Sequence, residues 1–168
     1  MCPRMPQAKT SRDCRNSEVN IFVLDYDQPK CAEYHCNQHV VKMIIESVQM
    51  LSTACRLNGL DQGYKITHQN HPCSVWVRAS LSNWKWLESL VYHLNEEFKF
   101  RFKGVDHKSF LVSQALSTPR IEDLGLTPFA LAMPEHCRRP DPVEAYRCYY
   151  QQEKKFATWT KRDRPFWI

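Results

Sequence analysis

Glycine is scarce in this chain, with 4 residues among 168, which argues against an all-β or loop-rich architecture because such folds use glycine in their turns. Long apolar runs are also missing, and no stretch approaches the roughly 18 residues that a membrane-spanning helix needs. The N-terminus lacks the apolar core of a secretory signal peptide. We therefore expect a soluble, cytoplasmic protein without a membrane partner. A chain of this length is typical of one domain.

Cys-x-x-Cys pairs are absent from the sequence, although it contains 8 cysteines. Without a secretory signal, a disulfide framework is not expected. Most of the cysteines fall within segments that look helical, so buried and reduced thiols are the expected state. These cysteines are Cys31, Cys36, Cys55, Cys73 and Cys148.

Positive charge is in moderate excess, with a net charge of +5 and a pI of about 8.8. Most of the excess lies near the end of the chain, because residues 138–168 hold 8 Lys and Arg against 4 Asp and Glu. A basic segment with interleaved aromatics suits a phosphate backbone and exposed bases. The simpler reading is a solvated surface, and charge alone does not separate the two.

Helical periodicity organises the rest of the sequence, which predicts an all-α fold: a compact bundle of about four helices with irregular loops and an aromatic, basic C-terminal tail. Residues 1–18 are expected to form a flexible extension, and residues 19–168 a single helical domain. Asp27 with Pro29, Pro72, Asp106, and Asp141 with Pro142 mark the helix starts. The predicted helices span residues 30–58, 72–104, 106–116 and 141–156, and residues 117–140 are predicted to be irregular.

A narrow polar stripe follows the first long helix, whose remaining circumference is apolar. Its members are separated by steps of 4, 3, 4, 3 and 4, which places them on one face. One interpretation is a solvent face with a Lys42–Glu46 pair. The other is the wall of a cleft, where Glu46 near Lys42 and His39 acts as an acid or base and Lys42 is a candidate amine nucleophile. The stripe consists of His35, His39, Lys42, Glu46, Gln49 and Thr53.

The loop Gln69-Asn70-His71-Pro72 stands before the second predicted helix. Its residues are typical of a helix N-cap. The functional reading is that Asn70 and His71 orient a phosphate or a base beside Glu46. Arg78, about two turns into that helix, either grips the DNA backbone or is solvated.

The C-terminal tail and a group of histidines and cysteines give two further hypotheses. Trp159 and Trp167 are predicted to stack on unpaired bases, and Lys161 and Arg162 to contact phosphates. A metal site would need two sets of ligands to converge, and we expect none. These sets are Cys31, His35, Cys36 and His39, and His68, His71 and Cys73.

Taken together, these motifs resemble the pyrimidine-dimer DNA glycosylase family, the small all-α phage endonuclease V-type enzymes and their bacterial relatives. The segment Asn37-Gln38-His39 followed by Glu46 is similar to the segment that carries the family's catalytic glutamate. Lys42, Glu46 and Gln49 resemble the Lys-x-x-x-Glu-x-x-Gln pattern of the bacterial relatives. The segment Asn70-His71-Pro72, followed by Trp76, is similar to their Asn-His-Pro segment. The resemblance covers residues 20–103, and the tail is loosely similar to the end of the phage enzyme.

The resemblance implies a base-excision repair glycosylase with AP lyase activity on damaged or modified pyrimidines, including pyrimidine dimers. In that family the α-amine of the chain attacks the sugar C1′ to form an imine, a glutamate assists, and β-elimination cuts the strand. The extrahelical base is accommodated by base flipping. The expected partner is double-stranded DNA, the expected state a monomer without a cofactor, and the expected location the nucleoid or, for a virus-encoded protein, the host cytoplasm.

One departure from the family concerns the N-terminus. Chains of the family begin just before the run that resembles Asn20-Ile21-Phe22, which is why Asn20 counts among the catalytic candidates, but here 18 or 19 residues precede this run. Either translation starts later, near Val19, or the extension folds back, or Lys42 supplies the amine; failing all three, the lyase step is lost. Two rival functions are a non-catalytic nucleic-acid-binding protein and a metal-dependent hydrolase that uses the His/Cys set.

Overall fold

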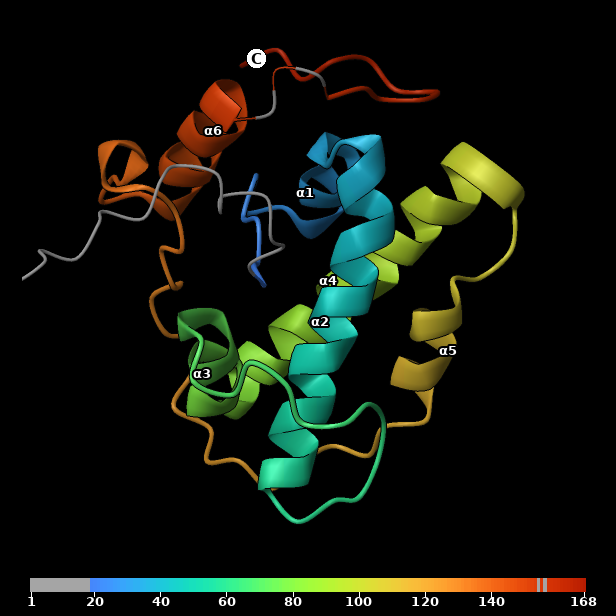
Figure 1. The fold of residues 1–168 in the computed structure, drawn as a ribbon, viewed down its shortest axis with the longest axis vertical. Coiled ribbons are helices and arrows are strands. Elements are labelled where there is room, and N and C mark those ends of the chain that lie inside the picture. Colours follow the sequence, from blue (N-terminus) through green and yellow to red (C-terminus); the bar gives the residue numbers. More distant parts are fainter. Residues whose placement is uncertain (1–18, 154, 156) are drawn as a thin grey trace, which may run out of the picture.

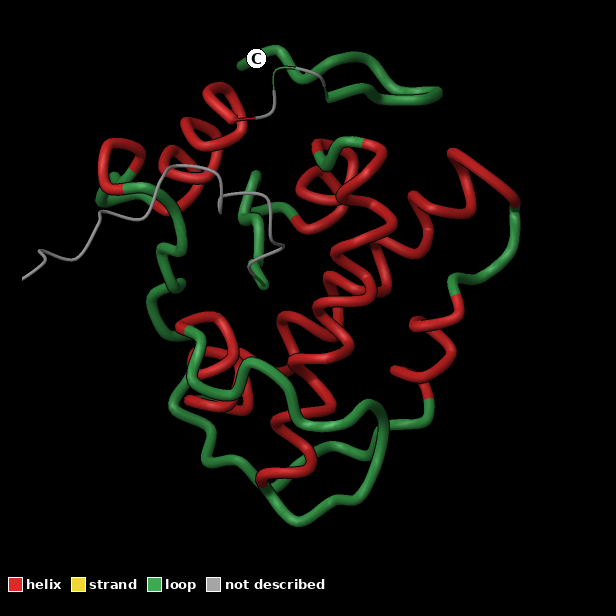
Figure 2. The backbone as a smooth tube through the Cα atoms, viewed as in Figure 1, coloured by secondary structure: helices red, strands yellow, loops and turns green. Residues whose placement is uncertain are grey.

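Helices make up the regular structure of this chain in a computed structural model that describes residues 19–153, 155 and 157–168. The described part contains no strand (Figure 2), so the predicted all-α class is confirmed. The described residues form six α-helices instead of about four, with one π-helical turn and one 3₁₀ turn. Their bounds are α1 (Gln28–Tyr34), α2 (Asn37–Leu57), α3 (Pro72–Ala79), α4 (Leu81–Phe98), η1 (Lys99–Lys103), α5 (Lys108–Gln114), η2 (Glu135–Cys137) and α6 (Pro142–Glu153).

Helix α2 lies at the centre of the molecule and packs against α3, α4 and α5 (Figure 1). Its apolar side chains meet those of α4, and burying one such side chain contributes roughly 1.5–3 kcal/mol. The wide apolar arc predicted for this helix is therefore confirmed, because neighbours cover it on several sides. The buried side chains of these two helices include Ile44, Val48 and Leu51 from α2 and Trp84, Leu87, Val91 and Leu94 from α4.

Several helix ends lie where the sequence predicts them. Asp27 caps α1 by accepting a hydrogen bond from the Lys30 amide, and α3 begins at Pro72. Gly59 and Gly104 both adopt positive φ angles, of 86° and 66°, just beyond the ends of α2 and η1. Glycine is favoured there because a left-handed residue closes the last helical turn without a side-chain clash. Asp141 opens α6 as predicted, with its carboxylate 2.8 Å from the Val143 amide.

The first long helix is broken, contrary to the continuous helix predicted over residues 30–58. His35 has a ψ angle of 132° and Cys36 one of 162°, which separates α1 from α2. Arg101 stabilises the break by donating to the carbonyl oxygens of Glu33 and His35, both at 2.7 Å. Such partners replace the hydrogen bonds that a continuous helix would have made.

The second predicted helix is also broken, at Ser80, whose φ of −155° is extended. The Ser80 hydroxyl donates to the Gly125 carbonyl oxygen at 2.7 Å, so the irregular segment that contains Gly125 supplies a hydrogen-bond partner at the break. The predicted cap of the third helix is wrong as well. His107, and not Asp106, accepts from the Ser109 amide, while Asp106 accepts from Asn95 instead.

The apolar run at residues 19–24 is an extended segment buried between α6 and α2 (Figure 1). None of its residues is more than 5% exposed. The predicted extension at residues 1–18 and the predicted end of the last helix at Phe156 lie outside the described residues. None of the described helices combines the length and the apolar character that a bilayer span requires.

Candidate functional site

The predicted polar stripe lies along one face of α2, except for His35. Because α2 begins at Asn37, His35 does not belong to the stripe; it lies in the helix break, fully buried, with its Nδ1 2.7 Å from the Cys31 carbonyl oxygen. Burial lowers the pKa of His35 to about 4, so this side chain is neutral at pH 7. The other members keep their predicted order along one face: His39, Lys42, Glu46, Gln49 and Thr53.

Glu46 is the central group of the stripe and is only 6% exposed. Its Oε1 lies 3.4 Å from the ammonium nitrogen of Lys42, and its Oε2 accepts a hydrogen bond from the backbone amide of Asn20 at 3.3 Å. Burial raises the pKa of Glu46, against the opposing effects of Lys42, the Asn20 amide and His68. A carboxyl group with a raised pKa and an amine beside it is suited to proton transfer near neutral pH.

Asn20 brings the extended segment 19–24 to Glu46. Its side-chain nitrogen donates to the Ala132 carbonyl oxygen at 2.8 Å, and its side-chain oxygen accepts from Tyr146 at 3.1 Å and from the Ile21 amide at 2.8 Å. The side chain is thus engaged away from Glu46, while the backbone N–H of the same residue is directed at the carboxylate. The predicted catalytic candidates Asn20, Lys42 and Glu46 therefore meet at one place.

His39 is buried beside this place and is enclosed by aromatic side chains. Its ring stacks on Phe22 at 4.5 Å between centroids, and its Nδ1 lies 2.6 Å from the Tyr150 hydroxyl. These contacts make His39 a support for the extended segment, and a direct role in proton transfer stays a prediction.

The loop before α3 is fastened to the far end of the stripe. The Thr53 hydroxyl lies 3.3 Å from both the amide and the carbonyl oxygen of Thr67. His71 caps α3 as predicted, because its Nδ1 accepts from the Cys73 amide at 3.1 Å. Arg78 donates to the Gln69 carbonyl oxygen at 2.5 Å, so it holds this loop. Asn70 is exposed at its tip.

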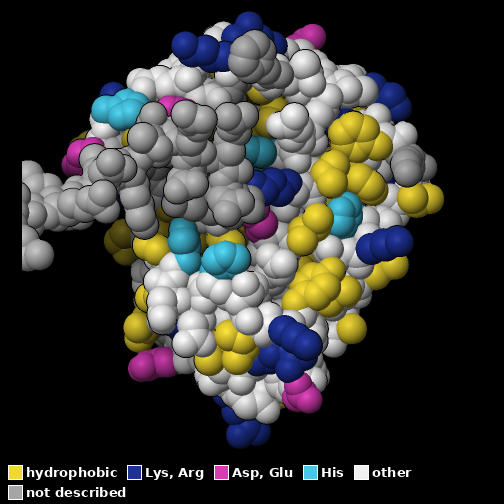
Figure 3. Space-filling view, viewed as in Figure 1, with side chains coloured by type: hydrophobic (Ala, Val, Ile, Leu, Met, Phe, Trp, Pro, Cys, Tyr) yellow, Lys and Arg dark blue, Asp and Glu magenta, His cyan; other side chains and the backbone are white. Residues whose placement is uncertain are grey.

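Cys73 connects this loop with Glu46 through Asn20. The Cys73 thiol lies 3.7 Å from the Asn20 side-chain oxygen, and burial raises its pKa to about 12, which makes it an inert thiol. His71 is thus joined through Cys73 and Asn20 to the carboxylate. The surface view shows histidine side chains close to an acidic and a basic side chain near the middle of one face (Figure 3).

The C-terminal tail is packed across α1 and η1, at the end of α2 that carries Asn37. The Trp159 indole donates to the Tyr34 carbonyl oxygen at 2.9 Å, and Trp167 packs edge-on against Tyr34 at 5.6 Å. Both tryptophans are half-buried, so stacking on bases would require them to leave these contacts. The exposed aromatic residue of the tail is Phe166, at 82%. Base stacking by Trp159 and Trp167 stays a prediction.

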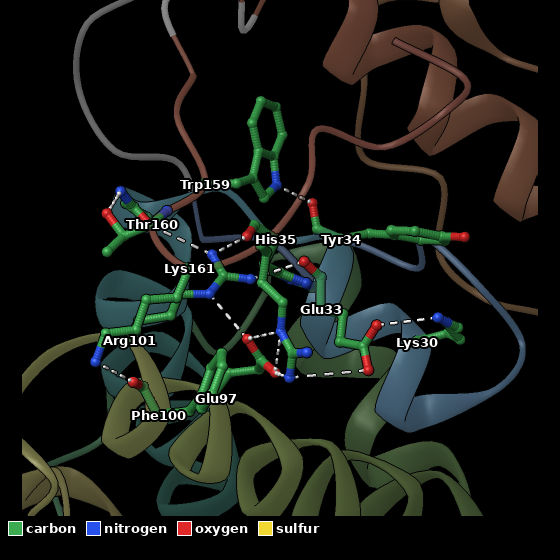
Figure 4. A network of polar contacts seen from close by, with 12 residues as sticks. Lys30, Glu33, Tyr34, His35, Glu97, Phe100, Arg101, Trp159, Thr160 and Lys161 are labelled. Carbon is green, nitrogen blue, oxygen red and sulfur yellow. Dashed lines mark hydrogen bonds and ion pairs between the residues drawn. The ribbon is translucent and has the colours of Figure 1, made fainter.

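Two basic residues of the tail, Lys161 and Arg162, already have protein partners. Arg162 pairs with Glu97 at 2.5 Å, and the Lys161 ammonium donates to the Phe100 carbonyl oxygen at 3.0 Å (Figure 4). Arg101 joins the same network through Glu97 at 2.8 Å. The charge of Arg162 is therefore balanced within the protein, whereas that of Lys161 has no acidic partner in the described contacts.

The two sets of histidines and cysteines that a metal site would have needed do not come together in the part of the chain that the structure describes, where no group of three or more His, Cys, Asp or Glu side chains could hold an ion. The metal-dependent hydrolase therefore has no ligand set among these residues. All the described cysteines are free, and all but the half-buried Cys148 are buried.

Sequence reasoning missed the polar role of two tyrosines. Tyr146 and Tyr150 lie one turn apart on α6 and are fully buried in the core. Their hydroxyls, however, bond to Asn20 and His39. The sequence signals this role only through the spacing of four residues, which places both tyrosines on one face of α6. Once that face is buried, each hydroxyl needs a polar partner.

The geometry brings a buried carboxylate, a lysine amine and a backbone nitrogen within hydrogen-bonding or ion-pairing distance. Such a group can transfer protons to and from an amine, and it is held by α2, by the extended segment and by α6. Comparison with protein-family models, with curated proteins and with solved structures finds no match to this chain.

Proposed function

We propose that this protein is a DNA glycosylase with AP lyase activity, which acts on damaged or modified pyrimidines in double-stranded DNA. The observation that carries the proposal is the approach of the Asn20 backbone nitrogen to Glu46 at 3.3 Å, with Lys42 at the other carboxylate oxygen. An amine at this place has a proton acceptor in contact, as imine chemistry at the sugar C1′ requires.

The reaction balances with these groups and water. The uncharged amine attacks C1′ as the bond to the base breaks, and the base leaves with a proton that the attacking nitrogen gives up. The nitrogen lone pair then breaks the bond between C1′ and the ring oxygen O4′, which takes up a proton, and the sugar opens to a protonated imine. The resulting imine activates the neighbouring C2′, from which Glu46 removes a proton, and the 3′ phosphate leaves by β-elimination. Hydrolysis then returns the free amine.

The nucleophile that we propose is the α-amine of a shortened chain, which begins either at Asn20, whose nitrogen contacts Glu46, or one residue earlier at Val19. In the 168-residue chain the Asn20 nitrogen is a peptide amide and cannot attack. At pH 7 roughly 10–20% of an α-amine is uncharged, against fewer than about 1 in 1,000 lysine amines.

Borohydride trapping on DNA with an abasic site or a pyrimidine dimer tests this assignment. We expect a chain released from a fusion with Asn20 or Val19 as its first residue to form the covalent complex at least tenfold faster than the full chain. Lys42→Arg in the shortened chain should still be trapped. Loss of trapping in that variant would assign the amine to Lys42, and no trapping of any form with intact DNA binding would leave a non-catalytic binding protein.

The acid side of the pH–rate profile should respond to Lys42. Burial raises the Glu46 pKa and Lys42 lowers it, so Lys42→Met removes the main opposing effect and raises this pKa further. Because Glu46 must be ionised to accept a proton, the acidic limb of single-turnover cleavage should move to higher pH. Lys42→Arg keeps the charge and should leave the limb in place; an equal shift in both variants would contradict the electrostatic explanation.

The salt dependence of DNA binding should distinguish the basic residues of the tail. Each phosphate contact that is lost reduces the slope of log affinity against log salt by about 0.9. Arg164 is an exposed basic residue of the tail and, like Lys161, is expected to contact a phosphate. We expect Lys161→Gln with Arg164→Gln to reduce the slope by about 2. Arg162→Gln should change it less, because Glu97 and Glu33 balance its charge. Fluorescence anisotropy at several salt concentrations measures the slope, and an unchanged slope in the double variant would remove the tail from the interface.

A further inference from the structure

Tyr146 is a buried residue that bonds to the side chain of Asn20, whose backbone nitrogen contacts Glu46. Its side chain is fully buried in α6. Its single hydroxyl proton is shared between the Asn20 side-chain oxygen at 3.1 Å and the Ala130 carbonyl oxygen at 2.7 Å, and its oxygen accepts from the Ala132 amide at 3.3 Å. One hydroxyl thus fastens together the extended segment, α6 and the irregular segment around residues 130–132.

The Asn20 side chain is held at both of its polar ends. Its nitrogen donates to the Ala132 carbonyl oxygen at 2.8 Å, and its oxygen faces Tyr146 and the Ile21 amide. These contacts fix the side-chain plane. With the side chain held by these contacts, the backbone nitrogen of Asn20 lies 3.3 Å from the Glu46 carboxylate.

We propose that Tyr146 is a positioning residue, which holds residues 19–20 so that the nitrogen at this point stays against Glu46. The inference rests on the proposed function for its catalytic consequence, but the geometry itself is independent of it. Tyr146 touches neither the reacting atoms nor Glu46 and acts through Asn20. Loss of its hydroxyl keeps the aromatic ring in the core and removes one of the hydrogen bonds to the Asn20 side-chain oxygen, which still accepts from the Ile21 amide and contacts the Cys73 thiol.

The first measurement follows the Asn20 amide by NMR and requires no activity. In the full chain, the shift of this amide should follow the titration of Glu46, because its N–H donates to the carboxylate. Tyr146→Phe should reduce this response of the amide shift to pH. The same variant should also raise the hydrogen-exchange rate of the Asn20 amide at least tenfold. Tyr64→Phe, which removes a hydroxyl that contacts Ser109 on α5 and not the extended segment, should keep both.

The second measurement follows single-turnover trapping of the chain that begins at Asn20. A displacement of about 1 Å in a reacting group costs up to roughly 100-fold in rate, so we expect Tyr146→Phe to lower the rate by 10- to 100-fold at saturating DNA. The dissociation constant for DNA should change less than twofold. Tyr64→Phe, whose hydroxyl contacts Ser109 instead, should keep the wild-type rate.

Asn20→Ala removes the same fastening from the other side and covers the case in which Tyr146→Phe fails to fold. The double variant should be no slower than the slower single variant, because both changes break one connection. An unchanged Asn20 amide in Tyr146→Phe would overturn the positioning role. Altered NMR signals with an unchanged trapping rate would show that Tyr146 positions Asn20 without affecting the reaction. If the wild-type chain that begins at Asn20 were not trapped at all, the proposed function would be wrong, and the NMR measurement would still test the positioning role.

Discussion

Glu46→Gln is expected to abolish strand cleavage while DNA binding persists. Glutamine keeps the size of the side chain and can still accept from the Asn20 amide, but it cannot take up a proton. A positioned acid or base typically contributes 10²- to 10⁴-fold, so the single-turnover cleavage rate should fall by about this factor. The group acts in the transition state and not mainly in binding, so the dissociation constant should stay within about twofold.

Glu88→Gln provides the matched control for this variant. Glu88 lies on α4, is half-buried, and like Glu46 has a pKa raised by burial, but no contact joins it to the stripe in the described structure. Its cleavage rate should equal that of the wild type in a gel assay on DNA with an abasic site. A wild-type rate in Glu46→Gln would exclude Glu46 as the acid or base, and equal losses of binding and cleavage would make the carboxylate structural.

The sequence predicts the elements whose signals are local. Asp27, Pro72 and Asp141 mark helix starts because capping and proline geometry involve only neighbouring residues. The stripe on α2 could be read for the same reason, since helical periodicity alone places Lys42 and Glu46 on one face. The sequence could not predict the burial of Glu46, because the carboxylate is covered by Asn20, which lies 26 residues earlier in the chain.

Features that depend on distant partners could not be predicted. The break at His35 needs Arg101, 66 residues away, and the hold on Asn20 needs Tyr146, 126 residues away. The tail gives the same lesson, since an aromatic and basic composition suits DNA as well as a protein surface. In this structure Trp159 and Arg162 use those properties to bind α1 and α4.

Arg101→Met should cause the largest loss of stability among single changes remote from Glu46. The Arg101 side chain is completely buried, and it pairs with the buried carboxylate of Glu97 at 2.8 Å. It also donates to the carbonyl oxygens of Glu33 and His35, which the break between α1 and α2 leaves without helical partners (Figure 4). Methionine fills similar space but supplies no donor, so both carbonyls and part of the carboxylate become buried without partners.

Breaking a buried ion pair by removing one partner costs about 3–5 kcal/mol, and we expect a loss of this size in the free energy of unfolding of the full chain. Urea denaturation followed by circular dichroism measures it from the shift in midpoint at constant slope. Arg162→Met removes the half-exposed partner of the same Glu97 and should cost clearly less, since water replaces it. If Arg101→Met were no more damaging than Arg162→Met, the break would be held by the apolar packing of α1 on α4, and the carbonyl contacts of Arg101 would contribute little.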